Sequence, residues 1–405
     1  MSKIIKFIVF GLIALLVLVA FNFKSIQRLA KVNSLFDADK IVHNFSNMDE
    51  ALPASPLPIS GEKHVWPVNL QPLPETFESY GEEYGVKDVM LETKTTAMVV
   101  VKDGTIVFED YFLGTGPDDQ RISWSMSKSF VSSLIGVALK EGAIKSLDDQ
   151  VTEYAPLLKG SAYDGATLRN VLNMASGVKF NEDYLDPNSD INKMGRALAL
   201  GKSLDDFAAS IDERARTPGE GRLYVSIDTH VISMVLRGAT GKTLQEYFIE
   251  KLWSKMGPGA DAFYSTDGEG NAFALGGLNM RTRDYALFGE LFRNEGKRNG
   301  EEIIPADWVA ASTKNTAPLD VEGFPTGYGY QWWVPVNSDG EYFAVGVYGQ
   351  YIYINPKAGV VVAKNAAHRD FLNMEVLKSG HMARNIEMFR GIAEHFSDWE
   401  KPQIP

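Results

Sequence analysis

The sequence predicts a mixed α/β (α+β) fold in which an antiparallel sheet from both chain ends is flanked by helices. Three observations predict it: a strong hairpin signal near residue 100, three strand-like runs after residue 340, and a long, mostly helical stretch between them, which is read as an inserted subdomain. The chain has 405 residues, 45% of them hydrophobic and 23% charged. This composition excludes a disordered chain, and the length suffices for two or three domains at roughly 150 residues each.

The predicted sheet begins with a hairpin and ends with three strands. Thr95–Lys102 and Thr105–Phe112 are rich in β-branched and aromatic residues, and Asp103-Gly104 between them is a strong turn signal. Since both ends of the chain carry strands, we expect them to pair in one sheet. The three C-terminal strands are expected at Tyr342–Val347, Tyr351–Asn355 and Val360–Lys364.

Helices are predicted between the two groups of strands and at the end of the chain. Apolar residues recur there at the spacing of one helix face. The clearest examples are Ser127–Glu141, Thr167–Met174 and Asp228–Gly238. A final amphipathic stretch, at about Glu375–Phe396, closes the chain as a helix.

The N-terminus carries an uncharged, apolar run. It extends from Phe7 to Phe23 and, with Ile4 and Ile5, reaches about 20 residues, the length that a bilayer core requires. Basic residues precede it as in a secretory signal, but the end of the run offers no good cleavage site. We therefore expect residues 1–45 to hold an uncleaved signal anchor or transmembrane helix, with the body of the chain periplasmic or extracytoplasmic. Secretion after signal cleavage is the alternative.

The next region, residues 46–80, is rich in proline, which disfavours helices and central strands. It is interpreted as a linker or as an arm that wraps the surface of the body. Trp66 is a candidate for pinning this region to the body.

Charge and composition exclude several functions. The net charge of −12 argues against nucleic-acid binding, because phosphate contacts need clustered Lys and Arg. The absence of cysteine excludes a thiolate nucleophile and cysteine metal sites. The six histidines form no H-E-x-x-H motif, so a zinc hydrolase is disfavoured, and His230 is expected to pack rather than to ligate. No metal or cofactor is implied, and the expected partner is a small-molecule substrate.

Ser125 and Lys128 form an S-x-x-K motif at the start of a predicted helix. Residues three apart share a helix face, so the lysine amine is able to reach the serine hydroxyl. Two further S-x-x-K matches, Ser60–Lys63 and Ser176–Lys179, lack a following helix. Lysine is a weak base at its free pKa, and this mechanism requires its pKa to fall by roughly 3 units. The alternative is a serine-rich helix start with a solvated lysine.

Four motifs then occur in the order found in one superfamily. They are Ser125-Met-Ser-Lys128, Pro218-Gly219-Glu220 with Tyr224-Val225-Ser226, Gly276-Gly277-Leu278 with Arg283-Asp284, and Val345–Gln350. The sequence therefore resembles the serine β-lactamase / penicillin-binding-protein superfamily. It looks closest to the class C-related branch of carboxylesterases and 6-aminohexanoate-dimer hydrolases. The resemblance implies a β-lactamase-like serine hydrolase domain at residues 81–398.

The resemblance also implies the roles of individual residues. Ser125 corresponds to the acylated nucleophile, Lys128 to its base and Tyr224 to the group that protonates the leaving group. The oxyanion hole would consist of the backbone N–H groups of Ser125 and Val347. Substrate-binding positions implied in the same way are Ser226, Tyr184, Gly346, Val345 and Asp186. For Tyr184 and Asp186, a solvated acidic loop at 178–190 is the alternative.

One departure from the family pattern bears on the substrate. The K-T-G lysine of β-lactamases and peptidases aligns with Ala344, and its threonine with Val345. A substrate carboxylate would lose its charge-assisted partner there. We therefore expect an esterase or a 6-aminohexanoate-dimer-hydrolase-like amidase acting through an acyl-enzyme. A β-lactamase or D-Ala-D-Ala carboxypeptidase is the alternative, and a non-enzymatic penicillin-binding sensor the second alternative.

Overall fold

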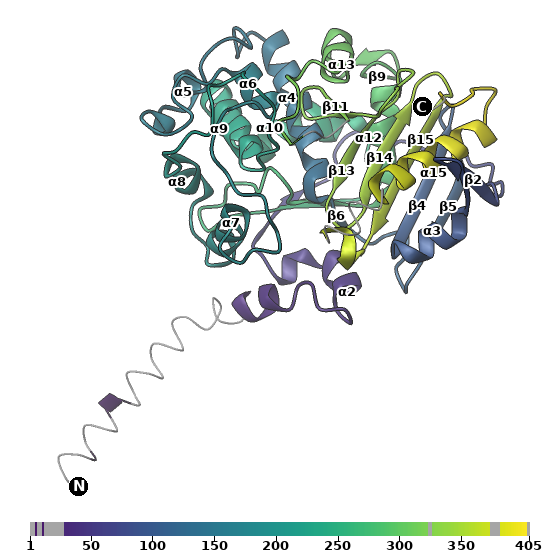
Figure 1. The fold of residues 1–405 in the computed structure, drawn as a ribbon, viewed down its shortest axis with the longest axis horizontal. Coiled ribbons are helices and arrows are strands. Elements are labelled where there is room, and N and C mark those ends of the chain that lie inside the picture. The colour runs from purple at the N-terminus through teal and green to yellow at the C-terminus, as the bar shows by residue number, and fades with distance from the viewer. Residues whose placement is uncertain (1–4, 6–9, 12–27, 323–325, 373–380, 403–405) are drawn as a thin grey trace.

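A seven-stranded antiparallel sheet is built from the two ends of the chain, as predicted (Figure 1). The computed structural model describes Ile5 and residues 10–11, 28–322, 326–372 and 381–402. The hairpin strands β4 (Thr95–Lys102) and β5 (Thr105–Tyr111) join the C-terminal strands where β4 pairs with β15 (Val360–Ala366). The sheet then continues through β14 (Gln350–Asn355), β13 (Tyr342–Gly346), β12 (Trp333–Val334) and β11 (Gly327–Tyr328).

The hairpin turn has the backbone that its sequence predicts. Asp103 and Gly104 have φ values of +46° and +79°. Positive φ at both central residues defines the type I′ turn, whose twist matches that of the two strands. The predicted hairpin is therefore confirmed.

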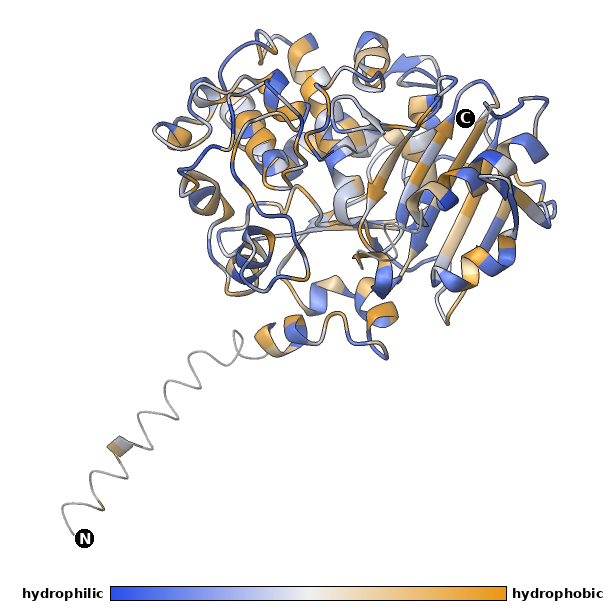
Figure 2. Ribbon diagram, viewed as in Figure 1, coloured by the Kyte–Doolittle hydropathy of each residue, from blue (hydrophilic) through white to orange (hydrophobic). Residues whose placement is uncertain are grey.

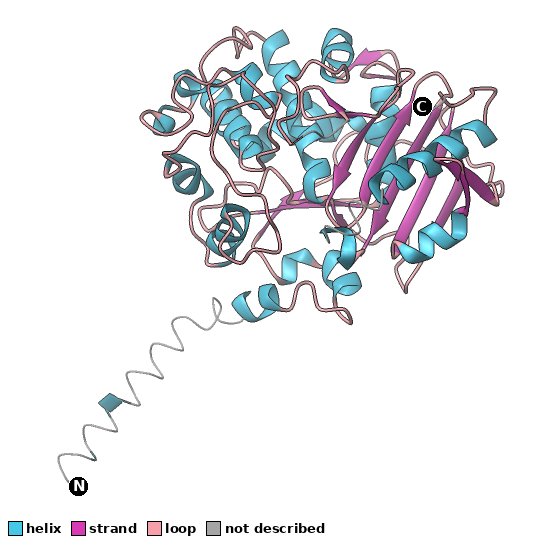
Figure 3. Ribbon diagram, in the orientation of Figure 1, coloured by secondary structure: helices cyan, strands magenta, loops and turns pink. Residues whose placement is uncertain are grey.

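Helices cover both faces of this sheet (Figures 1 and 3). On one face lies α12 (Thr282–Arg293), which contacts β4, β14 and β15. On the other face lie α3 (Val86–Glu92) and α15 (His381–His395). Figure 2 shows hydrophobic residues along the strands, as expected for a sheet buried on both faces. The predicted C-terminal helix is present, although its first expected turn, residues 375–380, lies outside the described residues.

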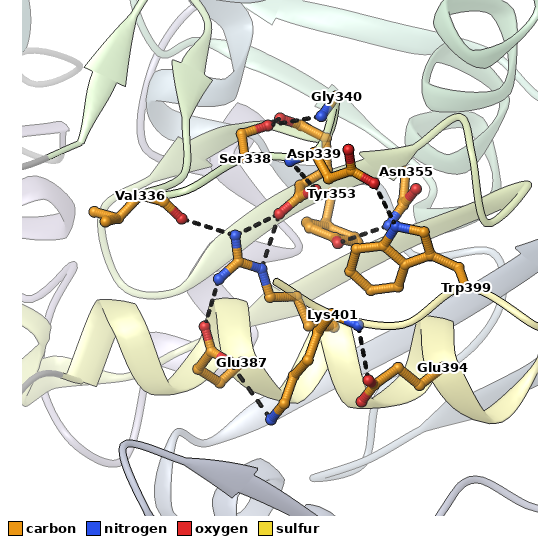
Figure 4. A network of polar contacts seen from close by, with 12 residues as sticks. Val336, Ser338, Asp339, Gly340, Tyr353, Asn355, Glu387, Glu394, Trp399 and Lys401 are labelled. Carbon is orange, nitrogen blue, oxygen red and sulfur yellow. Dashed lines mark hydrogen bonds and ion pairs between the residues drawn. The ribbon is translucent and has the colours of Figure 1, made fainter. Parts of the chain in front are cut away.

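A network of polar contacts, which includes Val336 and Glu387, connects α15 to the sheet (Figure 4). Arg390 is 1% exposed and donates hydrogen bonds to Glu341 Oε1 at 2.8 Å, to Glu387 Oε1 at 2.8 Å and to the Val336 carbonyl at 2.9 Å. Lys401 lies 3.8 Å from Glu387 Oε2. Because the charged groups at this helix–sheet contact have partners, their burial is tolerated.

The helical subdomain lies beside the sheet. The three helices predicted from periodicity are confirmed as α4 (Ser127–Lys140), α6 (Leu168–Leu172) and α9 (Asp228–Thr240). Shorter helices complete the subdomain: α5 (Val151–Tyr154), α7 (Asp190–Ala199), α8 (Leu204–Ala209), α10 (Leu244–Phe248) and α13 (Ala306–Ser312). Residues 127–138 of α4 are all buried, so this helix lies at the centre of the molecule.

A second sheet contains the strand that leads into α4. Its order is β1 (Ala54–Leu57), β7 (Ala262–Ser265), β8 (Leu278–Met280) and β6 (Arg121–Ile122). β1 comes from the proline-rich region. It is an edge strand, where proline is tolerated because one side of the strand makes no ladder hydrogen bonds.

The rest of the proline-rich region runs along the body. Ile106 N donates to the Pro67 carbonyl at 2.9 Å, and Asn69 N donates to the Ile106 carbonyl at 2.9 Å. These bonds cover the outer edge of β5, which would otherwise be an unpaired strand edge. Trp66 packs against the core. The region thus wraps the surface, while the domain bounds of 46–80 and 81–398 stay predictions.

Most of the predicted anchor, residues 7–23, lies outside the described residues. Within the part of the chain that the structure describes, no helix is long and apolar enough to span a bilayer. The following segment, residues 28–52, packs against the body. It contains α2 (Ile41–Phe45) and a 3-10 turn, η1 (Met48–Glu50), and it buries Leu35, Ile41, Phe45, Met48, Ala51 and Leu52.

Candidate active site

The candidate nucleophile lies in a strained turn. Ser125 belongs to the short 3-10 turn η2 (Trp124–Met126), between β6 and α4, and is half-buried. Trp124 has a φ of +42°, in the left-handed region, which costs a non-glycine residue about 1–3 kcal/mol. The turn is held because Ser123 N donates to the Leu278 carbonyl at 2.8 Å. The chain thus presents Ser125 directly before a long buried helix.

Lys128 lies one helical turn further along and is 2% exposed. Its Nζ donates to the Ser226 carbonyl at 3.1 Å and to Thr229 Oγ1 at 3.3 Å. It also lies 5.3 Å from the centre of the Tyr224 ring. Burial lowers the pKa of the Lys128 amine to about 7, although the carboxylates of Glu182 and Asp228 raise it. The amine is therefore able to act as a base near neutral pH.

Two carboxylates near this lysine were not predicted. Glu182 accepts a hydrogen bond from Ser226 N, and Asp228 Oδ1 accepts one from the Tyr163 hydroxyl at 2.8 Å. Burial raises the pKa of both carboxyls, that of Asp228 to about 7, while the charge of Lys128 lowers it. The three groups thus form one buried cluster in which desolvation favours the neutral forms.

Tyr224 stacks on a neighbouring aromatic ring. Its ring centre is 5.6 Å from that of Trp333 in β12, with an angle of 24° between the planes. Burial raises the pKa of the phenol well above its usual range, and the Ser125 side chain is close enough to lower it slightly by hydrogen bonding. A phenol with a raised pKa keeps its proton at neutral pH and is therefore suited to donate one.

Ser226 connects these groups. It is completely buried, its carbonyl accepts from Lys128, and its N–H donates to Glu182. Burial raises the pKa of Tyr184 and of Tyr224, and hydrogen bonding to the Ser226 side chain opposes this rise in both, so this side chain lies close to both phenols.

The end of β13 approaches the nucleophile turn closely. A Cβ on Gly346 would lie 2.4 Å from the Ser123 carbonyl oxygen and 3.1 Å from Ser125 N, so only glycine fits there. Val347 follows directly, and the backbone of this residue therefore lies beside that of Ser125. Gln350 Nε2 donates to the Val347 carbonyl at 3.3 Å and to the Ala366 carbonyl at 2.7 Å. This glutamine, which ends the fourth sequence motif but had no predicted role, fixes the turn after β13.

A cavity of about 310 Å³ opens at Ser125. Tyr184 and Val347 line it, as does Trp124. Val345 instead packs in the cluster under α15, on the other face of the sheet. Asp186 is not among the lining residues, and its Oδ1 accepts from Asn188 N at 2.8 Å within its own loop. The structure thus brings together Ser125, Lys128, Tyr224, Ser226, Tyr184, Gly346 and Val347, and keeps the side chains of Val345 and Asp186 apart from them.

The other candidates from the sequence lie elsewhere. Lys63 is exposed, and Lys179 forms an exposed ion pair with Glu213, so neither has the buried environment of Lys128. His230 is buried and lies 2.7 Å from Asp205 Oδ1, which agrees with a packed histidine. In the described ranges, no group of three His, Asp or Glu residues is placed to hold a metal ion.

Comparisons with known proteins identify the family of the chain. The beta-lactamase family model matches residues 86–373. The 6-aminohexanoate-dimer hydrolase of Paenarthrobacter ureafaciens is 32% identical over 291 residues, which cover 69% of this chain and 74% of that protein.

Solved structures show the same fold. A Bacillus anthracis protein proposed to be a 6-aminohexanoate-dimer hydrolase superposes with a TM-score of 0.80 at 25% identity, covering 91% of this chain and 97% of that one. A family VIII carboxylesterase superposes with a TM-score of 0.53 at 16% identity, covering 70% of this chain and 90% of the esterase.

Proposed function

The chain belongs to the beta-lactamase family and is a hydrolase, and from that premise we propose that it cleaves a small, uncharged ester or amide through an acyl-enzyme on Ser125. The observation that carries the proposal is the buried amine of Lys128. It lies one turn after the serine and faces the ring of Tyr224, and burial brings its pKa to about 7. A solvated lysine in a serine-rich helix start would have neither property.

In the proposed acylation, neutral Lys128 accepts the proton of the Ser125 hydroxyl as Oγ attacks the carbonyl carbon. The N–H groups of Ser125 and Val347 stabilise the oxyanion, and the loss of one such donor typically costs about 3 kcal/mol. Tyr224 gives its proton to the leaving oxygen or nitrogen as the bond to the carbonyl carbon breaks. The Lys128 ammonium then returns a proton to the phenolate. Water repeats the sequence on the acyl-enzyme and releases the acid.

An uncharged substrate is supported by Ala344, which stands where β-lactamases and peptidases have the lysine of their K-T-G motif. The side chain of Ala344 is 1% exposed, and Val345 faces the opposite side of the sheet. A carboxylate bound at this strand would therefore lack its partner. The name of the Paenarthrobacter relative supports an amide, and the carboxylesterase with the same fold supports an ester. Since the strand at Ala344 offers no cation to a substrate carboxylate, β-lactamase or peptidase activity on a carboxylate-bearing substrate is disfavoured.

Labelling with a fluorophosphonate probe tests the nucleophile. We expect the probe to label the wild type and the Ser133→Ala variant, but not Ser125→Ala. Ser133 is a matched control because it is buried in the same helix and its hydroxyl donates only to the Ser129 carbonyl, at 2.9 Å. Labelling that survives Ser125→Ala would contradict the assignment of Ser125 as the nucleophile.

A comparison of substrates tests the expected substrate class. Esters of p-nitrophenol should turn over faster than the β-lactam nitrocefin, and the reverse order would contradict the inference from Ala344 that the substrate is uncharged.

The localisation is part of the same proposal. The uncharged run at residues 7–23 supports a membrane anchor ahead of a catalytic domain at 81–398 outside the cytoplasm. The full-length chain should sediment with membranes, and a chain that begins at residue 28 should not. Sedimentation of both or of neither would contradict the anchor.

A further inference from the structure

One wall of the cavity at Ser125 comes from the N-terminal segment, residues 28–52. Val32, Phe36, Met48 and Leu52 of this segment line it. The segment precedes the region that matches the family model, which begins at residue 86. The four sequence motifs thus do not complete the cavity, and the N-terminal segment does.

The N-terminal segment is firmly built onto the site. Within the segment, Asn44 Nδ2 donates to the Ser34 and Leu35 carbonyls at 3.1 and 3.0 Å. The Phe36 ring stacks on Tyr348 at 5.0 Å, and the Phe45 ring meets Trp124 edge-on at 5.5 Å. Such aromatic pairs each contribute about 0.5–1.5 kcal/mol beyond their buried area. The wall is therefore an ordered part of the cavity.

The rest of the lining is also largely apolar. It includes Ile191, Met194 and Leu198 of α7 together with Phe273 and Leu275. Among the residues that the structure describes, Arg196 is the one charged residue of the lining; it is exposed, and its Nη1 donates to the Pro187 carbonyl at 2.7 Å. An apolar chain in this cavity would be surrounded by side chains that favour it over water.

The cavity lies on the acyl side of the reaction. Ser125 and Val347 line it, whereas Tyr224 and Lys128 do not. In the proposed mechanism the leaving group departs toward the Tyr224 hydroxyl. The cavity then remains for the group that stays bonded to Ser125, which is the acyl group.

We propose that this cavity, completed by the N-terminal segment, binds the acyl chain of the substrate and makes the enzyme selective for apolar acyl groups of medium length. This inference rests on the proposed acyl-enzyme mechanism and adds the substrate class. The volume of about 310 Å³ corresponds to ~10 groups of the size of a water molecule, each taking ~30 Å³. Chains of up to ~10 carbons therefore fit, and longer ones do not.

The experiment is a chain-length series of p-nitrophenyl esters from acetate to dodecanoate, assayed as kcat/KM below micelle-forming concentrations. Each methylene that enters the cavity should raise kcat/KM about fourfold. We expect a rise from acetate to octanoate and a fall at dodecanoate. A wild type that hydrolyses none of the esters overturns the proposed function and this inference with it. A wild type that hydrolyses acetate and octanoate equally well overturns this inference alone.

Two variants locate the effect in the cavity. Gly195 lines the cavity, and a Cβ there would meet no heavy atom within 4 Å, so Gly195→Trp fills space without a backbone clash. It should lower the octanoate-to-acetate ratio of kcat/KM at least tenfold. Gly195→Ala is the matched control. An unchanged octanoate-to-acetate ratio in Gly195→Trp overturns the inference.

The second variant tests the N-terminal wall itself. Val32→Glu places a carboxylate on that wall, and Val32 is only half-buried, so the fold tolerates the change. Ala30→Glu adds the same charge at an exposed position that does not line the cavity. The octanoate-to-acetate ratio should fall about tenfold or more in Val32→Glu and stay unchanged in Ala30→Glu. Equal ratios in the two variants would show that the N-terminal segment does not contact the acyl chain.

Discussion

The protonation of Lys128 should determine how activity depends on pH. Burial lowers the pKa of this amine from 10.5 to about 7. At pH 7, about half of the molecules then hold the neutral amine, against roughly one in 3,000 for an unperturbed lysine. Because only the neutral amine accepts the serine proton, kcat/KM should rise about tenfold per pH unit below pH 7 and level off above it.

The assay is kcat/KM for a p-nitrophenyl ester from about pH 5 to about pH 9, with nitrophenol read at its isosbestic wavelength. Lys128→Arg keeps the charge but not the base, because a guanidinium keeps its proton throughout this range. We expect it to lose at least about 10³-fold in kcat/KM. Lys140→Arg, at the exposed end of the same helix, is the matched control and should be unaffected.

A third variant tests the direction of the electrostatic effect. The negative charge of Glu182 raises the pKa of Lys128, so Glu182→Gln should move the acid limb of the profile to lower pH. A wild-type profile that is flat between about pH 6 and about pH 8 would show that Lys128 is not the base. A Lys128→Arg enzyme that keeps more than a few per cent of the activity would show the same.

Three further outcomes are expected. In Gln350→Leu, the Val347 carbonyl loses a side-chain donor, so kcat should fall roughly 10- to 100-fold with KM nearly unchanged, and steady-state kinetics with an unchanged kcat would contradict a positioning role. Removal of residues 1–27 should leave thermal stability and kcat/KM intact, whereas removal of residues 1–45 should lower both, since buried side chains of that stretch contribute about 2 kcal/mol each. Lys364 is completely buried and its pKa falls from 10.5 to about 7, so Lys364→Met should stabilise the fold by about 5 kcal/mol below pH 7. Because the unfolded chain stays protonated up to about pH 10.5, that gain should shrink as the pH rises from 7 to 10.5, and urea unfolding that shows a constant gain would contradict it.

The main elements and the reacting groups follow from local patterns in the sequence. Asp103-Gly104 determines its turn because both residues adopt the positive φ that the turn requires. The apolar periodicity of α4 predicts a helix, and the structure buries residues 127–138 of this helix. Spacing alone gives three S-x-x-K matches, and the buried helix that follows Ser125 selects Ser125 and Lys128 among them. Such signals act over a few residues and survive in a single sequence.

The remaining site residues depend on contacts between distant segments. Glu182 stands in an acidic loop beside Asp183, and composition does not distinguish the carboxylate that reaches Lys128 from its solvated neighbour. Gln350 resembles any polar residue at a strand start, although it connects two parts of the sheet that are 16 residues apart. Residues 28–45 were assigned to the anchor region and residues 46–52 to the proline-rich region, because the few apolar residues of this segment show a binding face only against residues such as Trp124, far away in the sequence.

Strain and packing couple the N-terminal segment to catalysis. Trp124 directly precedes Ser125, and Tyr348 directly follows Val347, the two proposed oxyanion donors. Both Trp124 and Tyr348 have left-handed backbones, with φ of +42° and +66°. Each such conformation costs about 1–3 kcal/mol and persists only when neighbours hold it. Phe36 and Phe45 both pack on these two rings, at centre-to-centre distances from 5.0 to 6.0 Å. Four contacts worth about 0.5–1.5 kcal/mol each offset strain of this size. We therefore expect the segment that lines the proposed acyl cavity also to hold the proposed oxyanion hole in place, and loss of this segment should lower kcat for acetate esters as well as the preference for longer chains.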